Sequence, residues 1–221
     1  MRRFPLFCIL LFILLPTGVF CQSGEHTPAT WKNDIASFEK ADKASKPPQK
    51  AILFTGSSSI RFWEDLPQRF PNKKVINRGF GGAYLSDVVY YFDRIVIPYR
   101  PRKIVVYAGE NDIAGGKTAD EVFQHFEALL RLWKQKASRS KFIFISLKPS
   151  PVRYEKISEV RKANELIRQR LKEEKRATFV DVFTPMLGPD GKPREELFRP
   201  DRLHLNKQGY DLWESLVRPY L

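Results

Sequence analysis

The segment KIVVYAGEND at residues 103–112 joins an uninterrupted apolar run to a cluster of glycine and polar residues. A run of consecutive apolar side chains predicts a strand that is covered on both faces, as in a parallel sheet. In an open parallel sheet, the ligand site lies just beyond the carboxyl ends of the strands. The segment therefore predicts a buried strand at 103–108 and functional residues at 109–112.

Four other short runs have the same apolar character, at residues 51–55, 74–77, 141–147 and 178–182. Longer amphipathic stretches separate them, with apolar residues at helical spacing after Val88, Val122 and Ile157. Alternation of strands and helices predicts a parallel sheet with helices on both faces. We therefore expect one α/β sandwich over residues 51–221, with no internal repeat and no second domain.

The size and charge of the chain bound its class. Its 221 residues include 17 Phe, 8 Tyr and 4 Trp, which excludes a disordered, collagen-like or coiled-coil chain. The formal net charge is +13, but the basic residues are spread along the sequence with no run of five. We expect a solvated basic surface that weakly attracts membrane surfaces and anionic polymers, and no specific nucleic-acid binding.

Residues 1–21 have the three parts of a secretory signal peptide. The start, Met1-Arg2-Arg3, is basic; residues 4–20 carry no charge; and a polar segment begins at Gln22. The sequence therefore predicts an exported protein. The uncharged run of 17 residues approaches the about 20 that span a bilayer, so retention as a membrane anchor is the alternative.

The two cysteines lie at or before the expected cleavage site. Cleavage is expected after Cys21, with cleavage after Gly24 as the alternative, and Cys8 lies within the signal. The mature chain then holds neither a disulfide nor a catalytic thiol.

Residues 22–50 are expected to form an N-terminal helix and a linker. Trp31, Ile35 and Phe38 lie at spacings of four and three, which predicts a helix over residues 31–43 with one apolar face. Two prolines at positions 47 and 48 end it, because proline cannot continue a helix.

Glycine and polar residues follow three of the predicted strands, at 56–59, 79–82 and 109–112, and the sequence Asp-Arg-Leu-His stands at 201–204. These residue types suffice for nucleophilic acyl transfer. A serine hydroxyl attacks a carbonyl once a base takes its proton, and histidine is the base suited to neutral pH. The spacing of Asp201 and His204 lets both side chains face the same way, so that the carboxylate orients the imidazole.

The choice of base follows by elimination among three histidines. His26 lies in the N-terminal tail and His125 lies inside a predicted helix, which leaves His204. Asp201 has an alternative as an ordinary helix cap, since aspartate is common just before helices.

Acyl transfer also needs hydrogen-bond donors for the anionic tetrahedral intermediate. The backbone N–H groups of Ser58 and Gly82 and the side-chain amide of Asn111 are the candidates. Each has a structural alternative: Ser58 as a helix N-cap, Gly82 as a turn residue with positive φ, and Asn111 as a turn residue.

Taken together, the four segments resemble the sequence blocks of the SGNH hydrolase superfamily, the GDSL-type esterases and lipases. Ser58 falls on the serine of the nucleophile block, Gly82 on the glycine block, and Asn111 on the asparagine of Gly-x-Asn-Asp. Asp201 and His204 match the Asp-x-x-His block. The resemblance runs in order from about residue 51 to the C-terminus. It implies a flavodoxin-like three-layer α/β/α fold with about five parallel strands, Ser58, Asp201 and His204 as the catalytic triad, and no cofactor or metal.

The nucleophile block departs from the family pattern at one position. Ser57 stands where the family has aspartate, which leaves three consecutive serines at 57–59. The choice of Ser58 over its neighbours then depends on the register of the resemblance. Arg61, Arg78 and Glu110 lie near the site in sequence, and we expect them on the surface or in a supporting position rather than in the reaction.

The sequence thus predicts an exported serine esterase whose partner is a small-molecule or carbohydrate ester. The compact chain shows no long lid-like insertion, which favours short acyl groups, and we expect deacetylation of a carbohydrate. A lysophospholipase or thioesterase acting on lipid acyl esters is one alternative, which the basic surface would suit. A non-catalytic carbohydrate-binding relative is another.

Overall fold

The computed structural model describes residues 26–221, and the predicted signal peptide, Cys8 and Cys21 lie outside these residues. Five parallel strands form one sheet in the order β2-β1-β3-β4-β5. Their bounds are β1 Ile52–Gly56, β2 Val75–Gly79, β3 Lys103–Tyr107, β4 Lys141–Ile145 and β5 Ala177–Val180. Each lies within about two residues of a predicted strand, and the order is the flavodoxin-like one.

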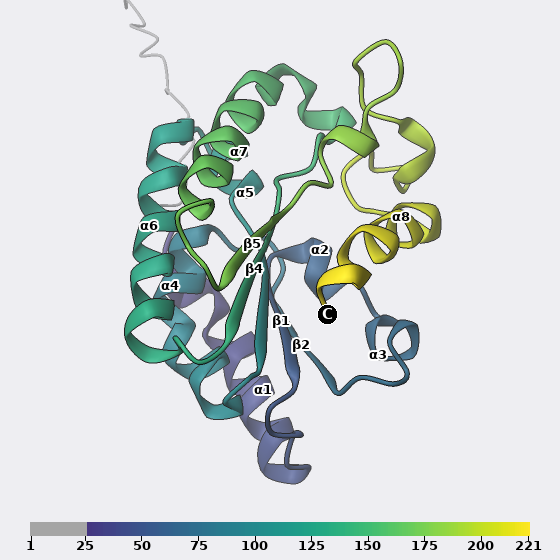
Figure 1. Ribbon diagram of the computed structural model, residues 1–221. Helices are drawn as coiled ribbons and strands as arrows, with labels where there is room; N and C mark the ends of the chain where they lie inside the picture. Colours follow the sequence, from purple (N-terminus) through teal and green to yellow (C-terminus); the bar gives the residue numbers. More distant parts are fainter. Residues whose placement is uncertain (1–25) are drawn as a thin grey trace, which may run out of the picture.

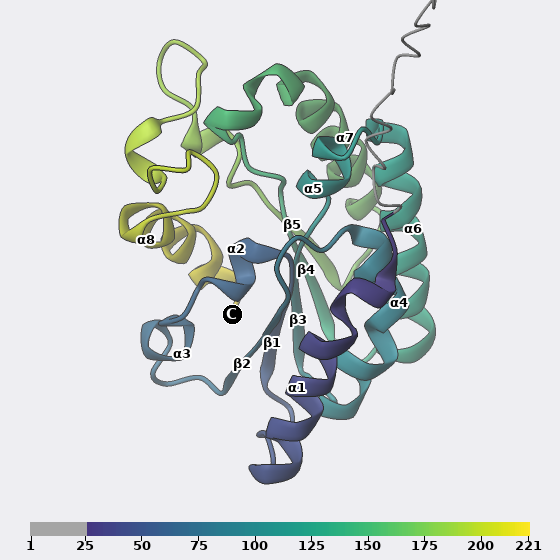
Figure 2. The same ribbon diagram turned by 180° about the vertical axis from the view of Figure 1, so that it is seen from behind.

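Helices cover both faces of the sheet, which confirms the predicted three-layer sandwich (Figures 1 and 2). One face carries α1 Lys32–Ala44, α4 Leu85–Ile95, α6 Ala119–Lys136 and α7 Ile157–Leu171. The other carries α2 Ser58–Arg61, α3 Leu66–Arg69 and α8 Lys207–Val217. The remaining helices are short: α5 Glu110–Ala114, η1 Pro28–Trp31, η2 Ile97–Tyr99, η3 Pro151–Lys156, η4 Thr184–Met186, η5 Glu195–Leu197 and η6 Arg218–Tyr220.

The core is divided by the sheet into two apolar clusters, one on each face. Phe92, Phe126 and Trp133 are buried in the larger cluster, and Trp63 and Trp213 in the smaller one. Burial of an aromatic side chain contributes a few kcal/mol, so these helices are held mainly by packing. The strands read as continuous apolar runs because both of their faces are covered.

The N-terminal helix is part of this packing. The predicted helix at 31–43 is observed as η1 followed by α1, and Trp31 and Ile35 are buried in the larger cluster. At its far end, Asp42 pairs with Arg78 and accepts a hydrogen bond from the Tyr99 hydroxyl. Residues 28–44 therefore cover the sheet instead of standing apart from it. Between residues 26 and 221, no helix is both long enough and apolar enough to cross a membrane.

Candidate active site

The candidate site lies where the strand order reverses, between β1 and β3, at the carboxyl edge of the sheet. Ser58 follows β1 and Asn111 follows β3. In flavodoxin-like sheets this is the position at which ligands bind. Gly56 makes the turn out of β1 feasible: its φ is +126°, and a Cβ there would lie 1.9 Å from the Tyr107 carbonyl oxygen. Only glycine fits this conformation and this close approach.

Hydrogen bonds tie the segments of the site to one another. The Ser57 N–H donates to the Tyr107 carbonyl (2.9 Å), which joins the end of β1 to the end of β3. The Phe80 N–H donates to the Gly56 carbonyl (2.9 Å), which holds the glycine loop after β2 against β1. These contacts fix the relative positions of segments that are far apart in the sequence.

Among the three consecutive serines, only Ser58 reaches the histidine. Its Oγ lies 3.1 Å from Nε2 of His204. Ser57 is the N-cap residue of α2 without a side-chain capping bond, and Ser57 and Ser59 are both buried. The register of the short helix therefore points the middle serine, and not its neighbours, towards His204.

His204 is held on its other side by Asp201. Nδ1 of His204 lies 2.7 Å from Oδ2 of Asp201, and Oδ1 accepts hydrogen bonds from the N–H groups of Leu203 and His204, both at 2.9 Å. Burial alone raises the pKa of Asp201, but these hydrogen bonds and the His204 side chain outweigh it and lower the pKa to about 2. The carboxylate is therefore ionised at neutral pH and favours the Nδ1–H tautomer of the imidazole.

The loop that carries the Asp201–His204 pair has further supports. The Phe62 ring and the His204 imidazole pack edge to face, with ring centroids 4.9 Å apart. The Arg199 guanidinium lies over the Phe62 ring, 5.2 Å from its centroid. Arg202, between the two catalytic candidates, has a left-handed φ of +56° and pairs with Glu195. Asp201 and His204 therefore stand at the two ends of a tight turn, which brings their side chains together although they are three residues apart.

The structure also places the three candidate donors for an oxyanion. Neither the Ser58 nor the Gly82 backbone N–H donates to any other residue in the described part of the chain. Gly82 has a φ of +78°, a backbone conformation that glycine adopts with less strain than other residues. Asn111 donates one Nδ2 hydrogen to the Ala83 carbonyl at 3.1 Å, and an amide nitrogen carries a second hydrogen.

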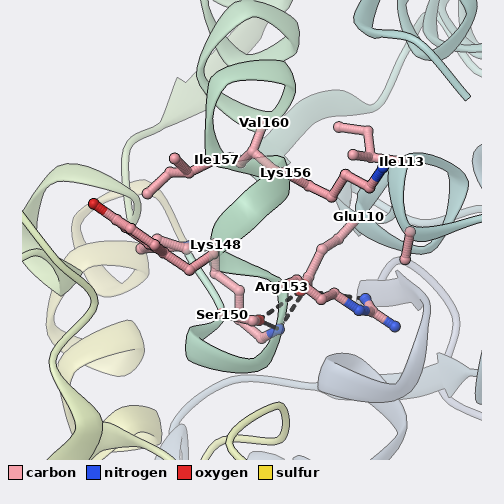
Figure 3. A pocket seen from close by; sticks show the side chains of 11 residues that line it. Glu110, Ile113, Lys148, Ser150, Arg153, Lys156, Ile157 and Val160 are labelled. Atoms are coloured by element: carbon pink, nitrogen blue, oxygen red, sulfur yellow. Dashed lines mark hydrogen bonds and ion pairs between the residues drawn. The ribbon is translucent and has the colours of Figure 1, made fainter. Parts of the chain in front are cut away.

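A charged cluster of Glu110, Lys148, Ser150 and Arg153 lies next to Asn111 in the fold (Figure 3 shows the cluster), and Arg153 donates a hydrogen bond to Asn111 Oδ1. Lys148 Nζ donates to Glu110 Oε2 (2.5 Å) and to Ser150 Oγ (2.6 Å), and Ser150 Oγ donates to Glu110 Oε1 (2.5 Å). Arg153 Nη1 lies 3.2 Å from Glu110 Oε1. Burial by itself raises the pKa of Glu110, but the charges of Lys148 and Arg153 outweigh it and lower that pKa. Two cations thus face one carboxylate.

Lys148, Ser150 and Arg153 were not predicted from the sequence, and Glu110 was expected only on the surface or in a supporting position. Glu110 is buried (4% exposed) and pairs with Arg153, which donates a hydrogen bond to Asn111. A signal was present, since KPSPVR at 148–153 follows β4 at the same edge of the sheet. The cavity that this cluster borders has a volume of about 10 Å³, room for about one water, so it is not a substrate pocket.

The other residues of the Gly-x-Asn-Asp segment and the other histidines have structural contacts. Asp112 is buried and accepts hydrogen bonds from the Leu85 N–H (3.2 and 3.0 Å), which anchors the start of α4. His125 Nδ1 lies 3.1 Å from Asp112 Oδ1, and His26 Nε2 lies 2.8 Å from Asp87 Oδ2. Neither His125 nor His26 contacts the serine segment, in agreement with the choice of His204.

The N-terminal segment contacts the glycine loop directly. The Trp31 indole N–H donates to the Gly81 carbonyl at 2.6 Å, and the His26 ring stacks on Tyr84 with centroids 3.4 Å apart. The part of the chain that was predicted as an N-terminal helix and linker thus supports the loop that carries the Gly82 N–H, a candidate oxyanion donor. Over residues 26–221, no group of three or more His, Cys, Asp or Glu side chains is arranged to hold a metal ion.

Comparison with known proteins gives one family. The model of the GDSL-like Lipase/Acylhydrolase family matches residues 50–212. Platelet-activating factor acetylhydrolase IB subunit alpha2 of Gallus gallus is 27% identical over 172 residues, which cover 72% of this chain and 70% of that protein.

Solved structures share the fold over most of the chain. A GDSL-like lipase from Bacteroides thetaiotaomicron is 25% identical, with a TM-score of 0.74 over 85% of this chain and 96% of that one. A carbohydrate esterase family 3 protein from Talaromyces cellulolyticus has a TM-score of 0.62 at 15% identity, over 76% and 94% of the two chains.

Proposed function

The chain belongs to the GDSL-like lipase/acylhydrolase family and is a carboxylic ester hydrolase, and from this premise we propose that it removes acetyl groups from a carbohydrate by a Ser-His-Asp mechanism. The single observation that best supports the mechanism is the hydrogen-bonded series from Ser58 Oγ through His204 to Asp201, with distances of 3.1 and 2.7 Å. These are the contacts that a nucleophile, its base and the group orienting the base require.

In the first half of the proposed reaction, His204 Nε2 takes the Ser58 hydroxyl proton as Oγ attacks the ester carbonyl carbon. The negative charge that develops on the carbonyl oxygen is held by the Ser58 and Gly82 N–H groups and the Asn111 amide, each worth about 2.7–4 kcal/mol in the transition state. The tetrahedral intermediate then expels the alcohol, which receives the proton from the His204 imidazolium. Ser58 is left acylated.

In the second half, a water molecule attacks the acyl carbon and gives its proton to His204. The second tetrahedral intermediate collapses, the Ser58 oxygen leaves and recovers the proton from His204, and the carboxylic acid is released. Asp201 stays ionised throughout, because its role is to orient and stabilise the imidazolium rather than to accept the proton. Its lowered pKa of about 2 supports this assignment.

The acetyl group is proposed from two kinds of support. The short connections that carry Ser58, Gly82 and Asn111 offer little shelter for a long acyl group, and the longer connection from β5 to α8, residues 181–206, carries Asp201 and His204. The curated relative is by name an acetylhydrolase, and one fold relative is by name a carbohydrate esterase.

The first test is hydrolysis of para-nitrophenyl acetate, butyrate and palmitate by residues 22–221 beside the Ser58→Ala variant. We expect activity on the short esters that falls by at least about 10⁴-fold in Ser58→Ala, the scale seen when a serine nucleophile is removed. Ser57→Ala and Ser59→Ala are matched controls, because both hydroxyls lie within one residue of Ser58. Activity that survives in Ser58→Ala and disappears in one of the controls would assign the nucleophile to the serine replaced in that control.

A second candidate substrate is an acetylated lipid, which the name of the curated relative favours. Acetylated xylan and platelet-activating factor, assayed by acetate release, separate the two. Faster turnover of the polysaccharide supports the carbohydrate proposal. Turnover of the lipid alone would replace it, and preference for palmitate over acetate would contradict both.

We also propose that residues 1–21 direct export and are then removed. The basic start and the uncharged run support this. Mass spectrometry of the secreted protein would give its first residue, and a chain that retains residue 1 in a membrane fraction would favour the anchor.

A further inference from the structure

A basic groove lies at the amino edge of the sheet, opposite the edge that carries Ser58. Five exposed cations line it: Lys50, Arg100, Arg102, Lys136 and Arg139. They come from the segments that lead into β1, β3 and β4, together with the end of α6. Because the strands are parallel, these segments meet at one end of the sheet (Figures 1 and 2). The groove has a volume of about 760 Å³.

The cations of the basic groove are mostly without counter-charges. The groove has no acidic lining residue, and Lys136 pairs with Asp93 at 2.6 Å. Within residues 26–221, no carboxylate lies within salt-bridge distance of Lys50, Arg100, Arg102 or Arg139, whereas ten arginines elsewhere do form such pairs. Seven arginines of residues 26–221 thus have no carboxylate partner, and three of them stand together in the groove, open to an external partner. The other four are Arg131, Arg161, Arg176 and Arg199.

The strand starts beside the groove add to its charge. Lys103 and Lys141 are the first residues of β3 and β4 and stand opposite each other in the sheet register. Arg176, just before β5, donates to the Arg139 carbonyl at 2.5 Å. The pKa of Lys103 is lowered, first by burial and then by repulsion from Lys141 and Arg102. Lys103 Nζ donates to the carbonyl oxygens of Tyr220 (2.6 Å) and Leu221 (2.9 Å), so it adds positive charge beside the groove without lining it.

The backbone of the groove carries a further cost. Lys50 and Arg100 have left-handed φ values of +57° and +42°, and they are two of only three such non-glycine residues between residues 26 and 221. Glycine adopts this conformation with less strain. Both positions therefore carry a cationic side chain although the backbone conformation favours glycine. Strain of this kind is typical of positions that are retained for a function.

We propose that the basic groove binds an anionic polysaccharide, through carboxylate or sulfate groups, independently of the catalytic site. Guanidinium groups bind such planar or tetrahedral oxyanions with two hydrogen bonds at a time. The shape is concave, as a polymer chain requires. None of the exposed large apolar side chains, Tyr90, Val152, Tyr154 and Tyr220, lines the groove. Firm membrane binding adds inserted apolar residues to charge attraction, and single-stranded nucleic acid binding adds stacked aromatic ones. A lining without such residues favours a polysaccharide.

The test compares two triple variants of residues 22–221 that lose the same charge. Arg100→Gly, Arg102→Ser and Arg139→Ser removes the unpaired arginines of the groove, and glycine suits the φ of residue 100. Lys32→Ala, Lys192→Ser and Lys207→Ala removes three exposed cations that lie outside the groove. Binding to polygalacturonate, dextran sulfate, phosphatidylglycerol vesicles and duplex DNA is measured at low and moderate salt, with thermal unfolding as the check on folding.

We expect the groove variant to lose at least about tenfold in affinity for one or both polysaccharides and the control variant less than about twofold, with affinity falling as salt rises. Para-nitrophenyl acetate hydrolysis stays unchanged in both, so the result does not depend on the proposed substrate. Equal losses in the two variants would reduce the groove to a share of the net charge and overturn the proposal. Tighter binding of the vesicles or of DNA than of either polysaccharide would overturn it as well.

Discussion

The guanidinium of Arg153 donates a hydrogen bond to Oδ1 of Asn111 at 3.1 Å, and this bond determines which way the Asn111 amide faces. With Oδ1 accepting from Arg153, the Nδ2 group is turned towards the Ala83 carbonyl and the glycine loop. The bond also polarises the amide, because hydrogen bonds in series strengthen one another. Arg153 is in turn held by Glu110, so the buried cluster supports a proposed oxyanion donor.

Arg153→Met should lower kcat by about tenfold and leave KM nearly unchanged. The amide loses its orientation but not its donor, so the loss is smaller than the 10²–10³-fold typical of removing a donor. Steady-state kinetics on para-nitrophenyl acetate measure both constants, and Arg153→Lys should recover part of kcat. Arg131→Met, on the exposed side of α6, is the matched control. A rise in KM at constant kcat would show that Arg153 binds substrate instead.

Glu110→Gln should destabilise the protein by about 3–5 kcal/mol, the range for breaking a buried ion pair. Lys148 is 1% exposed, and the substitution leaves its charge without its carboxylate partner. Adding Lys148→Met removes that charge and should restore most of the loss. Urea unfolding of the two single variants and the double variant measures the coupling. A cost below about 1 kcal/mol for Glu110→Gln would contradict the importance of the pair.

Asp201 should make a small contribution to stability that disappears in acid. Its folded pKa of about 2 lies below the ordinary 3.8, so the contribution is complete above the unfolded value and is lost as the pH falls through the folded one. The side chain is 47% exposed, and solvent screening keeps the effect below about 1 kcal/mol. Between about pH 5 and about pH 3, the free energy of unfolding measured in urea should therefore fall less for Asp201→Asn than for the unchanged protein.

The control for this pH effect is Glu155→Gln, which removes an exposed carboxylate that forms no ion pair within residues 26–221. It should lose as much stability between the two pH values as the unchanged protein. Identical pH dependence in all three proteins would show that the hydrogen bonds to Asp201 do not favour its ionised form.

Trp31→Phe should lower kcat by about three- to tenfold while changing stability only slightly. The substitution removes the N–H that bonds to the Gly81 carbonyl but keeps an aromatic ring beside Gly82. A hydrogen bond of this kind contributes about 0.5–1.5 kcal/mol, and its loss loosens the loop that carries the Gly82 N–H. Kinetics and thermal unfolding of the same preparation separate the two effects.

Trp133→Phe is the matched control, because the Trp133 indole also donates to a backbone carbonyl, that of Ser140, at 3.1 Å. This bond lies at the far end of the sheet. Trp133→Phe should lose about as much stability as Trp31→Phe, but its kcat should be unchanged. Equal kcat in both variants would mean that the N-terminal segment supports the fold and not the glycine loop.

Much of the fold follows from local pattern. The strands were predictable because residues such as Ile104 to Tyr107 are covered on both faces, which leaves no room for polar alternation. Ser58 and Asn111 could be placed at one edge of the sheet because parallel strands deliver their carboxyl ends there, whereas His204 was chosen by elimination and Asp201 by its spacing from His204. The strand ends were displaced by a residue or two, since Gly56 still pairs in register with Gly79.

The charged cluster and the basic groove were beyond the reach of local pattern. Lys148 and Arg153 stand in a stretch rich in proline and polar residues, which is typical of a solvated loop. Only their contacts with Glu110 explain why Lys148 is buried and Arg153 is partly buried. The cations of the groove lie up to 89 positions apart, between Lys50 and Arg139, so the sequence shows a scattered charge. The parallel topology gathers them at one end.

The same topology gives the molecule an electrical polarity along its strands. The unpaired cations stand at one edge and the Ser58–His204 pair at the other, about 16 Å or more apart, the length of a five-residue strand. On a negatively charged support, such as a sulfonated bead, the protein should adsorb by its cationic end. The edge with the proposed catalytic residues would then face the bulk solution, which gives an oriented, linker-free immobilised enzyme.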